Sequence, residues 1–252
     1  MKIMFLGTGA ADYDWSRYGE PGIAGSTATL IDDRILIDCG PSVAKAMDRF
    51  GVPYSAVTDI VITHNHSDHF DPEVLKRIAD GAGHKLRFFA SPQLCRIAGP
   101  YCEVHPLDFG MRFQAGDCDF LALPANHTGE DIFEKTFLYL ITCRGRTLLY
   151  ALDTAWFPTL AYRLLGKTRL DGAVWDATMS QPEDCRIFEH TDPVMFAMQR
   201  RRFTLNGNMD EKTRIWFDHR ARTLWPSDPE EQEKIARREN VELARDGEVA
   251  VL

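Results

Sequence analysis

The sequence of 252 residues lacks a basic excess: 29 lysine and arginine residues stand against 37 aspartate and glutamate residues, giving a formal charge of −8. None of its six cysteines forms a CxxC pair, and the apolar stretch near the start covers only residues 3–6. The charge balance argues against a surface built for sequence-independent nucleic-acid binding, which depends on clustered lysine and arginine. The missing cysteine pairs exclude a zinc knuckle and a redox motif, and the apolar stretch is too short for a signal sequence or a membrane span. We therefore expect a cytoplasmic protein with reduced thiols and no membrane partner.

The chain also has no proline- or serine-rich linker and no low-complexity tract, which favours a single domain over residues 1–252. Short β-branched apolar runs predict strands at 2–6, 28–32, 35–38, 59–63, 86–90, 119–123, 137–142, 147–151, 173–176, 213–217 and 248–252. Helical patterns cover residues 43–50, 72–80, 158–165, 193–202 and 229–239. The mixture predicts an α/β fold of sheets with helices outside.

Three of these helices begin with an aspartate followed by proline, at Asp71, Asp192 and Asp228. An aspartate caps the free N–H groups of the first turn, and the fixed φ of proline suits that turn. Two predicted strands end in a histidine, at His64 and at His219. The two halves of the chain can therefore deliver ligands to one sheet edge.

The most informative stretch runs His-Asn-His-Ser-Asp-His from His64 to His69, between a strand and a capped helix. Imidazole and carboxylate suit zinc or manganese, and a catalytic ion keeps one coordination position for water. The four ligand-type side chains His64, His66, Asp68 and His69 exceed what one such ion needs. The stretch therefore predicts a site for two divalent ions.

This HxHxDH motif resembles the signature of the metallo-β-lactamase superfamily, in which a later histidine, an aspartate and a final histidine complete the site. The sequence supplies His127, Asp153 and His219 in that order, each after a predicted strand. The resemblance implies a four-layer αββα sandwich of two mixed sheets flanked by helices. It implies that His64, His66 and His127 hold one ion, that Asp68, His69 and His219 hold the other, and that Asp153 bridges them, with Asp68 also counted as catalytic.

The N-terminal segments Leu-Gly-Thr-Gly-Ala at residues 6–10 and Ile-Asp-Cys-Gly at residues 37–40 are similar to elements of the same superfamily. A carboxylate that accepts the outer N–H of a ligating imidazole fixes its tautomer, and Asp38 is the candidate for this task. A turn-forming acid at the strand end is the alternative interpretation of Asp38. For Gly7 and Gly9 we expect turn chemistry only.

Two divalent ions carry a charge of +4, and Asp68, Asp153 and a bridging hydroxide together carry −3. The net charge of the centre is therefore about +1, which favours an anionic or polarised substrate. A phosphate diester fits this centre, with the metal-activated hydroxide as nucleophile. Esters, thioesters and lactones remain alternatives, because each develops an oxyanion that the same ions can hold. A non-catalytic metal-binding protein is a further alternative.

His190 is a candidate general acid for a departing alkoxide, because it lies between Asp153 and His219. This position resembles the catalytic histidine of the phosphodiesterase branch of the superfamily, which includes tRNase Z and PhnP. The cysteine-rich zinc insertion of PhnP-like proteins is replaced by residues 13–21, so we expect no third metal. No glycine-rich arm for holding tRNA lies between Asp153 and His190, so we expect a small anionic substrate and no large nucleic acid.

Several positions stay open. Arg220 and Arg222 follow His219 and have two interpretations, a phosphate grip or solvated loop arginines. Trp15, Tyr18, Trp156 and Phe157 are candidates to line the pocket, with ordinary core or surface packing as the alternative. Zinc and manganese both accept the ligand set. The oligomeric state is open, a homodimer included.

Overall fold

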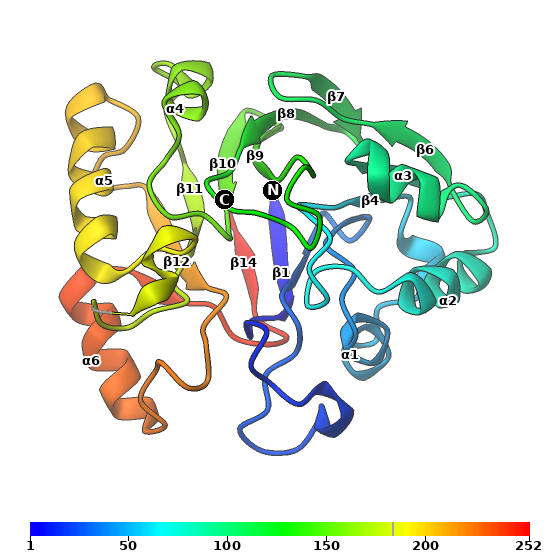
Figure 1. Cartoon of the computed structure of the whole chain (residues 1–252), viewed down its shortest axis with the longest axis horizontal. Helices are drawn as coiled ribbons and strands as arrows, with labels where there is room; N and C mark the ends of the chain where they lie inside the picture. The colour runs from blue at the N-terminus through cyan, green and yellow to red at the C-terminus, as the bar shows by residue number, and fades with distance from the viewer. Residues whose placement is uncertain (183) are drawn as a thin grey trace.

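The computed structural model describes residues 1–182 and 184–252 and contains two seven-stranded sheets packed face to face (Figure 1). In order across the first sheet the strands are β14 (Val249–Val251), β1 (Lys2–Gly7), β2 (Ala28–Ile31), β3 (Ile35–Ile37), β4 (Asp59–Val61), β5 (Arg87–Ala90) and β6 (Glu103–Pro106). Across the second they are β13 (Glu242–Leu243), β12 (Arg214–Asp218), β11 (Gly172–Asp176), β10 (Arg146–Ala151), β9 (Phe137–Cys143), β8 (Cys118–Pro124) and β7 (Arg112–Ala115). Both sheets are mixed, since β3 to β6 and β10 to β13 pair in parallel and the other neighbours are antiparallel.

Helices cover the outer faces of the two sheets, as Figure 1 shows. The first sheet is covered by α1 (Val43–Phe50), α2 (Pro72–Ala82) and α3 (Pro92–Ala98), and the second by α4 (Thr159–Leu165), α5 (Pro193–Asn206) and α6 (Pro229–Glu239). Short 3-10 helices lie at η1 (Trp15–Arg17), η2 (Tyr54–Ala56) and η3 (Cys185–Phe188). The predicted αββα sandwich is confirmed.

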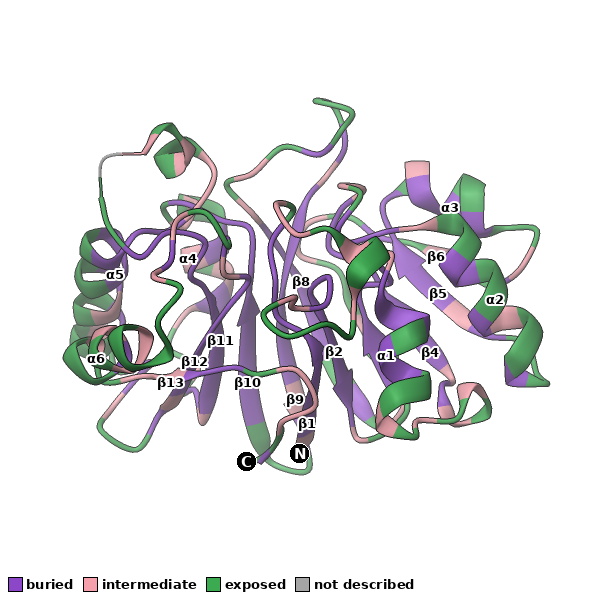
Figure 2. Cartoon of the chain, turned by 90° about the horizontal axis from the view of Figure 1, so that it is seen from below, coloured by how far each residue is buried: buried purple, intermediate pink, exposed green. Residues whose placement is uncertain are grey.

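Side-chain alternation along the central strands builds three apolar layers. In β1, Ile3 and Phe5 point into the core between the sheets, whereas Met4 and Leu6 face α1 to α3. Trp216 of β12 is fully buried and packs against Phe5 at 6.1 Å between ring centroids, so the two sheets contact each other directly. Figure 2 shows the strands as the buried part of the molecule and the helices as half exposed.

The predicted Asp-Pro helix starts are confirmed, because Asp71, Asp192 and Asp228 each accept a backbone N–H of the first turn. Four elements were not predicted from the sequence: β6, β7, β13 and α3. β6 and β7 are edge strands with largely exposed or half-buried side chains, and β13 has only two residues, so they carry little apolar periodicity. α3 begins with Ser91 and proline, a cap of the same kind with serine in place of aspartate.

Among the described helices, none is long and apolar enough to cross a membrane. That residues 1–252 form one domain stays a prediction, for which limited proteolysis is the direct test. For the site, the decisive feature is strand direction. β3 and β4 in one sheet, and β8, β10, β11 and β12 in the other, end at a common edge of the sandwich, where the loops that follow them meet.

Candidate metal centre

The segment between β4 and α2 folds into a turn that carries four predicted ligands. The backbone N–H groups of His69 and Phe70 both donate to the carbonyl oxygen of His66, at 2.9 and 3.0 Å. The turn also packs against the end of β3, where the Cys39 N–H donates to the carbonyl oxygen of His69 at 2.7 Å. A Cβ on Gly40 would lie 2.0 Å from the backbone oxygen of Asp68, so only glycine permits this contact.

Strained backbone occurs at three residues of the site, each shortly after a strand. Asp38 after β3, Asp153 after β10 and His219 after β12 all adopt left-handed backbone, with φ of 64°, 49° and 58°. This conformation costs non-glycine residues about 1–2 kcal/mol each. Such strain persists only where surrounding contacts over-determine it, and it is concentrated at functional sites.

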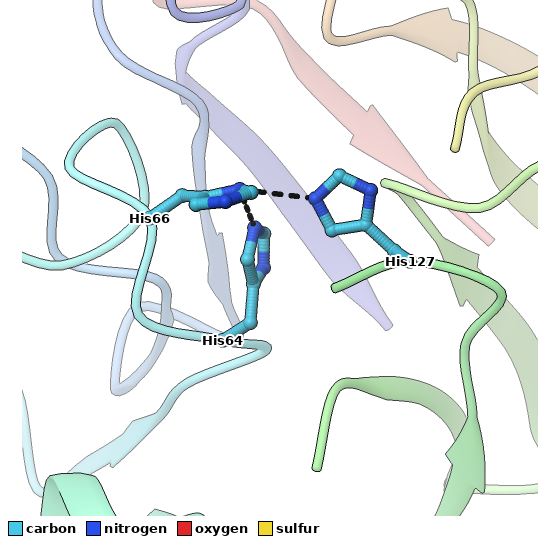
Figure 3. Close-up of side chains that lie close together, drawn as sticks. All are labelled: His64, His66 and His127. Atoms are coloured by element: carbon cyan, nitrogen blue, oxygen red, sulfur yellow. Dashed lines mark hydrogen bonds between the residues drawn. The ribbon is translucent and has the colours of Figure 1, made fainter. Parts of the chain in front are cut away.

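Three histidines converge in the first cluster (Figure 3). His66 Nδ1 lies 3.0 Å from His64 Nε2 and 3.0 Å from His127 Nε2. His64 and His66 come from the turn after β4, whereas His127 follows β8 of the other sheet. The three nitrogens therefore meet at one point between the two sheets.

The second cluster contains Asp68, His69 and His219. His219 Nε2 lies 3.1 Å from Asp68 Oδ2 and 3.2 Å from His69 Nε2. Asp153 lies beside this cluster, with Oδ2 2.8 Å from His69 Nε2 and Oδ1 3.2 Å from His219 Nε2. A carboxylate oxygen of Asp153 also lies within 4.8 Å of a ring nitrogen of His64, which belongs to the first cluster. The structure thus brings together all seven residues singled out by the sequence.

The chemistry of these groups fits a pair of cations. His127 Nδ1 donates to the backbone oxygen of Glu189 at 3.3 Å and His69 Nδ1 donates to Asp38 Oδ2 at 2.8 Å. In the neutral form, each ring then points the lone pair of Nε2 into its cluster. Asp153 Oδ2 is buried 2.8 Å from His69 Nε2, and within the described part of the chain no other group donates a hydrogen bond to it. Converging lone pairs and carboxylate oxygens repel one another unless positive charge lies between them, which divalent ions supply.

Asp38 and Thr63 form a pair behind the first-sheet ligands. Besides His69, Asp38 accepts the backbone N–H of Thr63 at 2.8 Å and its hydroxyl at 3.0 Å. The Thr63 hydroxyl in turn accepts from His64 Nδ1 at 3.0 Å. One buried carboxylate therefore orients two imidazoles, one directly and one through a hydroxyl. The predicted role of Asp38 beside a ligating histidine agrees with this geometry.

Asp176 and Thr178 form the equivalent pair in the second sheet. Asp176 Oδ1 accepts the Thr178 hydroxyl at 2.8 Å, and that hydroxyl accepts from His219 Nδ1 at 2.8 Å. His190 Nδ1 donates to Asp176 Oδ2 at 3.0 Å. With Nδ1 held by Asp176, Nε2 is the nitrogen of His190 that is free to exchange a proton with the cavity.

Burial and neighbouring charges set the protonation of the cluster. Burial lowers the pKa of His64 well below its usual value and that of His127 to about 4. Burial also opposes charge on His219, but Asp153 and Asp68 outweigh it and raise its pKa to about 9. For His190 the opposing burial is outweighed by Asp176 and Asp153, which raise its pKa. A cation bound beside His219 would therefore replace the proton that Asp153 and Asp68 favour on this histidine.

A cavity of about 490 Å³ opens onto the centre. Its walls include His66, Asp68, His127, Asp153, His190 and His219, together with Ala10, Ala11, Asp12, Ser67, Glu130, Thr178, Arg186, Glu189 and Ala221. Cavities of about 300–1,000 Å³ hold small molecules.

Six residues that the sequence offered as candidates for the pocket, two arginines and four aromatic residues, do not line this cavity. Arg220 is not a solvated loop arginine: its guanidinium donates to the backbone oxygens of Phe217 and Ala244. It lines a different cleft, as does Arg222, so neither reaches the metal-centre cavity as a phosphate grip. Trp156 and Phe157 line a separate groove beside α4 and α5. Trp15 and Tyr18 are absent from the described cavity lining as well.

Four residues that support the candidate ligands were not predicted from the sequence: Thr63, Asp176, Thr178 and Glu189. The available signal was weak: Asp176 ends a strand just as Asp38 follows one, and Thr178 comes two residues later. Glu189 acts through its backbone oxygen on His127 and through Oε1, which accepts the Thr128 hydroxyl at 2.8 Å. A backbone oxygen carries no sequence signature.

Comparisons with known proteins agree with this geometry. A family model described as "Beta-lactamase superfamily domain" matches residues 33–207. The anti-Pycsar protein Apyc1 of Bacillus phage 010DV004 is 35% identical over 69 residues, which are 27% of this chain and 25% of the phage protein. Ribonuclease Z of Gemmatimonas aurantiaca is 36% identical over 69 residues, 27% of this chain and 20% of the enzyme. The match thus spans a quarter or less of these curated relatives.

Solved structures extend the likeness over the whole chain. A diphosphatase of the PhnP family has a TM-score of 0.74 at 17% identity, covering 100% of this chain and 97% of that one. The short form of human tRNase Z has a TM-score of 0.68 at 19% identity, covering 100% and 99%. At these identities the likeness shows the fold. Because the family match covers well over half of the sequence, this chain belongs to the β-lactamase superfamily, whose members include metal-dependent hydrolases, and it has the metallo-β-lactamase fold.

Proposed function

We propose that this protein hydrolyses a small phosphate diester, cyclic diesters included, at a pair of divalent ions. His64, His66 and His127 would hold one ion, Asp68, His69 and His219 the other, and Asp153 would bridge them. Zinc suits this nitrogen-rich set best, and manganese is the second candidate. Two ions at such a site supply an activated water and positive charge for the phosphoryl oxygens.

The observation that carries the phosphodiester assignment is the placement of His190. Its Nδ1 is 3.0 Å from Asp176 Oδ2 and 3.4 Å from Asp153 Oδ1, so the ring lies beside the residue that would bridge the ions. Asp176 and Asp153 raise the pKa of His190 against the effect of burial, which favours the protonated ring. A protonated imidazole at this position can deliver its Nε2 proton to a departing alkoxide.

The charge around the cavity supports a small substrate with one phosphate. Asp12, Glu130 and Glu189 line it, and Arg186 is the only arginine or lysine among its described walls. Acidic groups at the opening disfavour polyanions, because each additional phosphate would approach carboxylates. Although Ribonuclease Z is among the relatives, this rim favours a small diester over a large RNA.

Turnover of bis(p-nitrophenyl) phosphate tests the proposal. The protein loaded with zinc or with manganese is expected to release p-nitrophenolate, and a chelator is expected to stop the reaction. Absence of chelator-sensitive turnover with either metal would refute the phosphodiesterase assignment. Parallel assays with p-nitrophenyl acetate, a thioester and a lactone test the alternative of an ester hydrolase of the same fold.

A His190→Ala variant tests the general acid. Loss of a general acid costs about 10²–10⁴-fold in rate when the leaving group needs a proton. We expect a loss of that size for 3′,5′-cyclic AMP, whose leaving group is an alkoxide, and a much smaller loss for bis(p-nitrophenyl) phosphate, whose leaving group is a stable anion. His84 is exposed and remote from the described site, so His84→Ala is the matched control. Equal losses for both substrates would refute the assignment.

A further inference from the structure

A second cleft lies on the other side of the segments that wall the metal centre. The loop after β1 and the loop after β12 run together at the lower side of Figure 1, joined where the Arg220 N–H donates to the Thr8 oxygen at 3.1 Å. Along the β12 loop the side chains alternate. His219 and Ala221 face the metal-centre cavity, whereas Arg220 and Arg222 line the second cleft. The two cavities share no described lining residue.

Positive charge is concentrated in this cleft, although the chain as a whole carries −8. Arg49, Arg220, Arg222 and Arg245 line it. Arg245 forms an ion pair with Glu233. Within the described part of the chain, the other three arginines have no carboxylate within 4.0 Å of their guanidinium groups.

The carboxylates of the cleft are already engaged. Glu20 forms an ion pair with Arg17 at 2.6 Å. Asp246 accepts the Thr8 hydroxyl at 2.8 Å and the Gly25 N–H at 2.7 Å. Glu20 and Asp246 are the described acidic residues of the lining, so the four arginines outnumber them. The local potential is therefore positive and attracts anions.

Aromatic rings hold two of the guanidinium groups in place. Arg220 lies over the Trp225 ring at 5.7 Å, and Arg49 lies over the Tyr18 ring at 5.7 Å. Stacking uses the face of a guanidinium group and leaves its N–H edge available for an anion. The edge of Arg220 is partly used by backbone oxygens, whereas Arg49 and Arg222 are exposed. Arg222 Nε donates to the Asp12 backbone oxygen at 3.3 Å, so its two terminal NH₂ groups and the guanidinium group of Arg49 are the donors that remain for a ligand.

Apolar side chains form much of the remaining wall, together with the polar side chains of Thr8, Ser227 and Gln232. Tyr13, Pro21, Trp225, Pro226 and Pro229 line a volume of about 590 Å³, enough for a ring system as well as an anionic group. The Trp225 indole is fixed by its N–H, which donates to the Ala177 oxygen at 2.6 Å. We propose that this cleft is a second ligand site, which binds a small phosphate monoester attached to a planar apolar body, with Arg49 and Arg222 donating to the phosphate.

Two guanidinium groups favour a phosphate monoester because it carries close to two negative charges and presents paired oxygens to each fork. The metal centre plays no part in this binding. The inference therefore stands or falls independently of the phosphodiesterase proposal.

Calorimetric titration of the metal-loaded protein with adenosine 5′-monophosphate tests the site. A second titration after metal removal by dialysis separates the cleft from the metal centre. We expect binding that survives metal removal and that is at least about tenfold tighter than binding of adenosine or of inorganic phosphate. The double variant Arg49→Ala/Arg222→Ala should weaken this binding about tenfold or more, because each charge-assisted hydrogen bond is worth about a factor of ten.

The matched control is Arg96→Ala/Arg163→Ala, which removes the same charge from exposed arginines outside both cavities. The control should change the affinity less than about twofold, since its charges are screened by solvent. Equal weakening by both double variants, unchanged binding in Arg49→Ala/Arg222→Ala, or no binding after metal removal would each overturn the proposal. Inorganic phosphate binding as tightly as the nucleotide would overturn the role of the apolar wall.

Discussion

Replacing Asp38 with asparagine is expected to weaken metal binding at the cluster that contains His69. Asp38 Oδ1 accepts the Thr63 N–H at 2.8 Å, and Oδ2 accepts His69 Nδ1 at 2.8 Å. An asparagine that keeps its oxygen toward Thr63 turns its NH₂ group toward His69 Nδ1. Two donors then face each other, so His69 must move its proton to Nε2, the nitrogen that would bind the ion.

The size of the effect follows from this tautomer change. Removing a partner behind a ligating histidine costs about 10–100-fold in metal affinity. The backbone itself should tolerate the change, because asparagine adopts the left-handed conformation that Asp38 has at φ 64°. The cluster of His64, His66 and His127 should be affected less, since the asparagine oxygen still accepts the Thr63 hydroxyl that orients His64.

Zinc titration against a chromophoric chelator measures both affinities, and elemental analysis gives the metal content. We expect one of the two sites in Asp38→Asn to weaken about 10–100-fold. Asp33→Asn is the matched control: Asp33 also has left-handed backbone, at φ 61°, and its carboxylate forms an exposed ion pair with Lys2 at 2.7 Å. If Asp38→Asn binds both ions as tightly as Asp33→Asn does, the orienting role of Asp38 is wrong.

Three further predictions follow from the site. Because Asp153 and Asp68 raise the pKa of His219 to about 9, zinc binding at pH 7 should release protons and weaken as the pH falls; calorimetry in buffers of different ionisation enthalpy measures this, and a buffer-independent heat would contradict it. Gly40→Ala should destabilise the protein by about 1–3 kcal/mol or more through its clash with the Asp68 oxygen, whereas Gly99→Ala, with no neighbour closer than 3.4 Å, should have little effect in denaturant unfolding. Thr178→Val should lower zinc affinity about 10–100-fold by leaving His219 Nδ1 without its acceptor, and an unchanged affinity would show that the hydroxyl is dispensable.

The residues that the sequence singled out as ligands lie together in the structure because each comes after a strand, and the end of a strand can be predicted from the sequence. The turn at His64–His69 is local, so its spacing alone indicates a metal site. His127, Asp153 and His219 carry no such signature singly, and they could be selected only by their order after the motif. Strand direction explains why that order succeeds: the carboxyl ends of β4, β8, β10 and β12 meet at one edge, so the residues that follow them meet too.

The supporting residues could not be predicted in the same way. Asp176, Thr178 and Thr63 belong to residue types that are common at strand ends, and nothing in a single sequence tells which of them contacts a histidine. The side of the sheet sandwich that Arg220 and Arg222 face depends on the path of the β12 loop, which is fixed by the bridge to the β1 loop. Contacts between segments about 200 residues apart determine these positions, and they become visible only in three dimensions.

The two clusters share one requirement that connects fold to chemistry. His64 and His66 need His127 to complete the first cluster, and Asp68 and His69 need His219 to complete the second, so each cluster takes residues from both sheets. The turn after β4 alone cannot close either of them. The Asp38–Thr63 pair orients the ligands of one sheet and the Asp176–Thr178 pair orients those of the other. The geometry of the centre therefore depends on the register between the sheets, which the apolar layer around Phe5 and Trp216 maintains. The buried core between the sheets therefore positions the candidate ligands together with the hydrogen bonds of the Asp38–Thr63 and Asp176–Thr178 pairs.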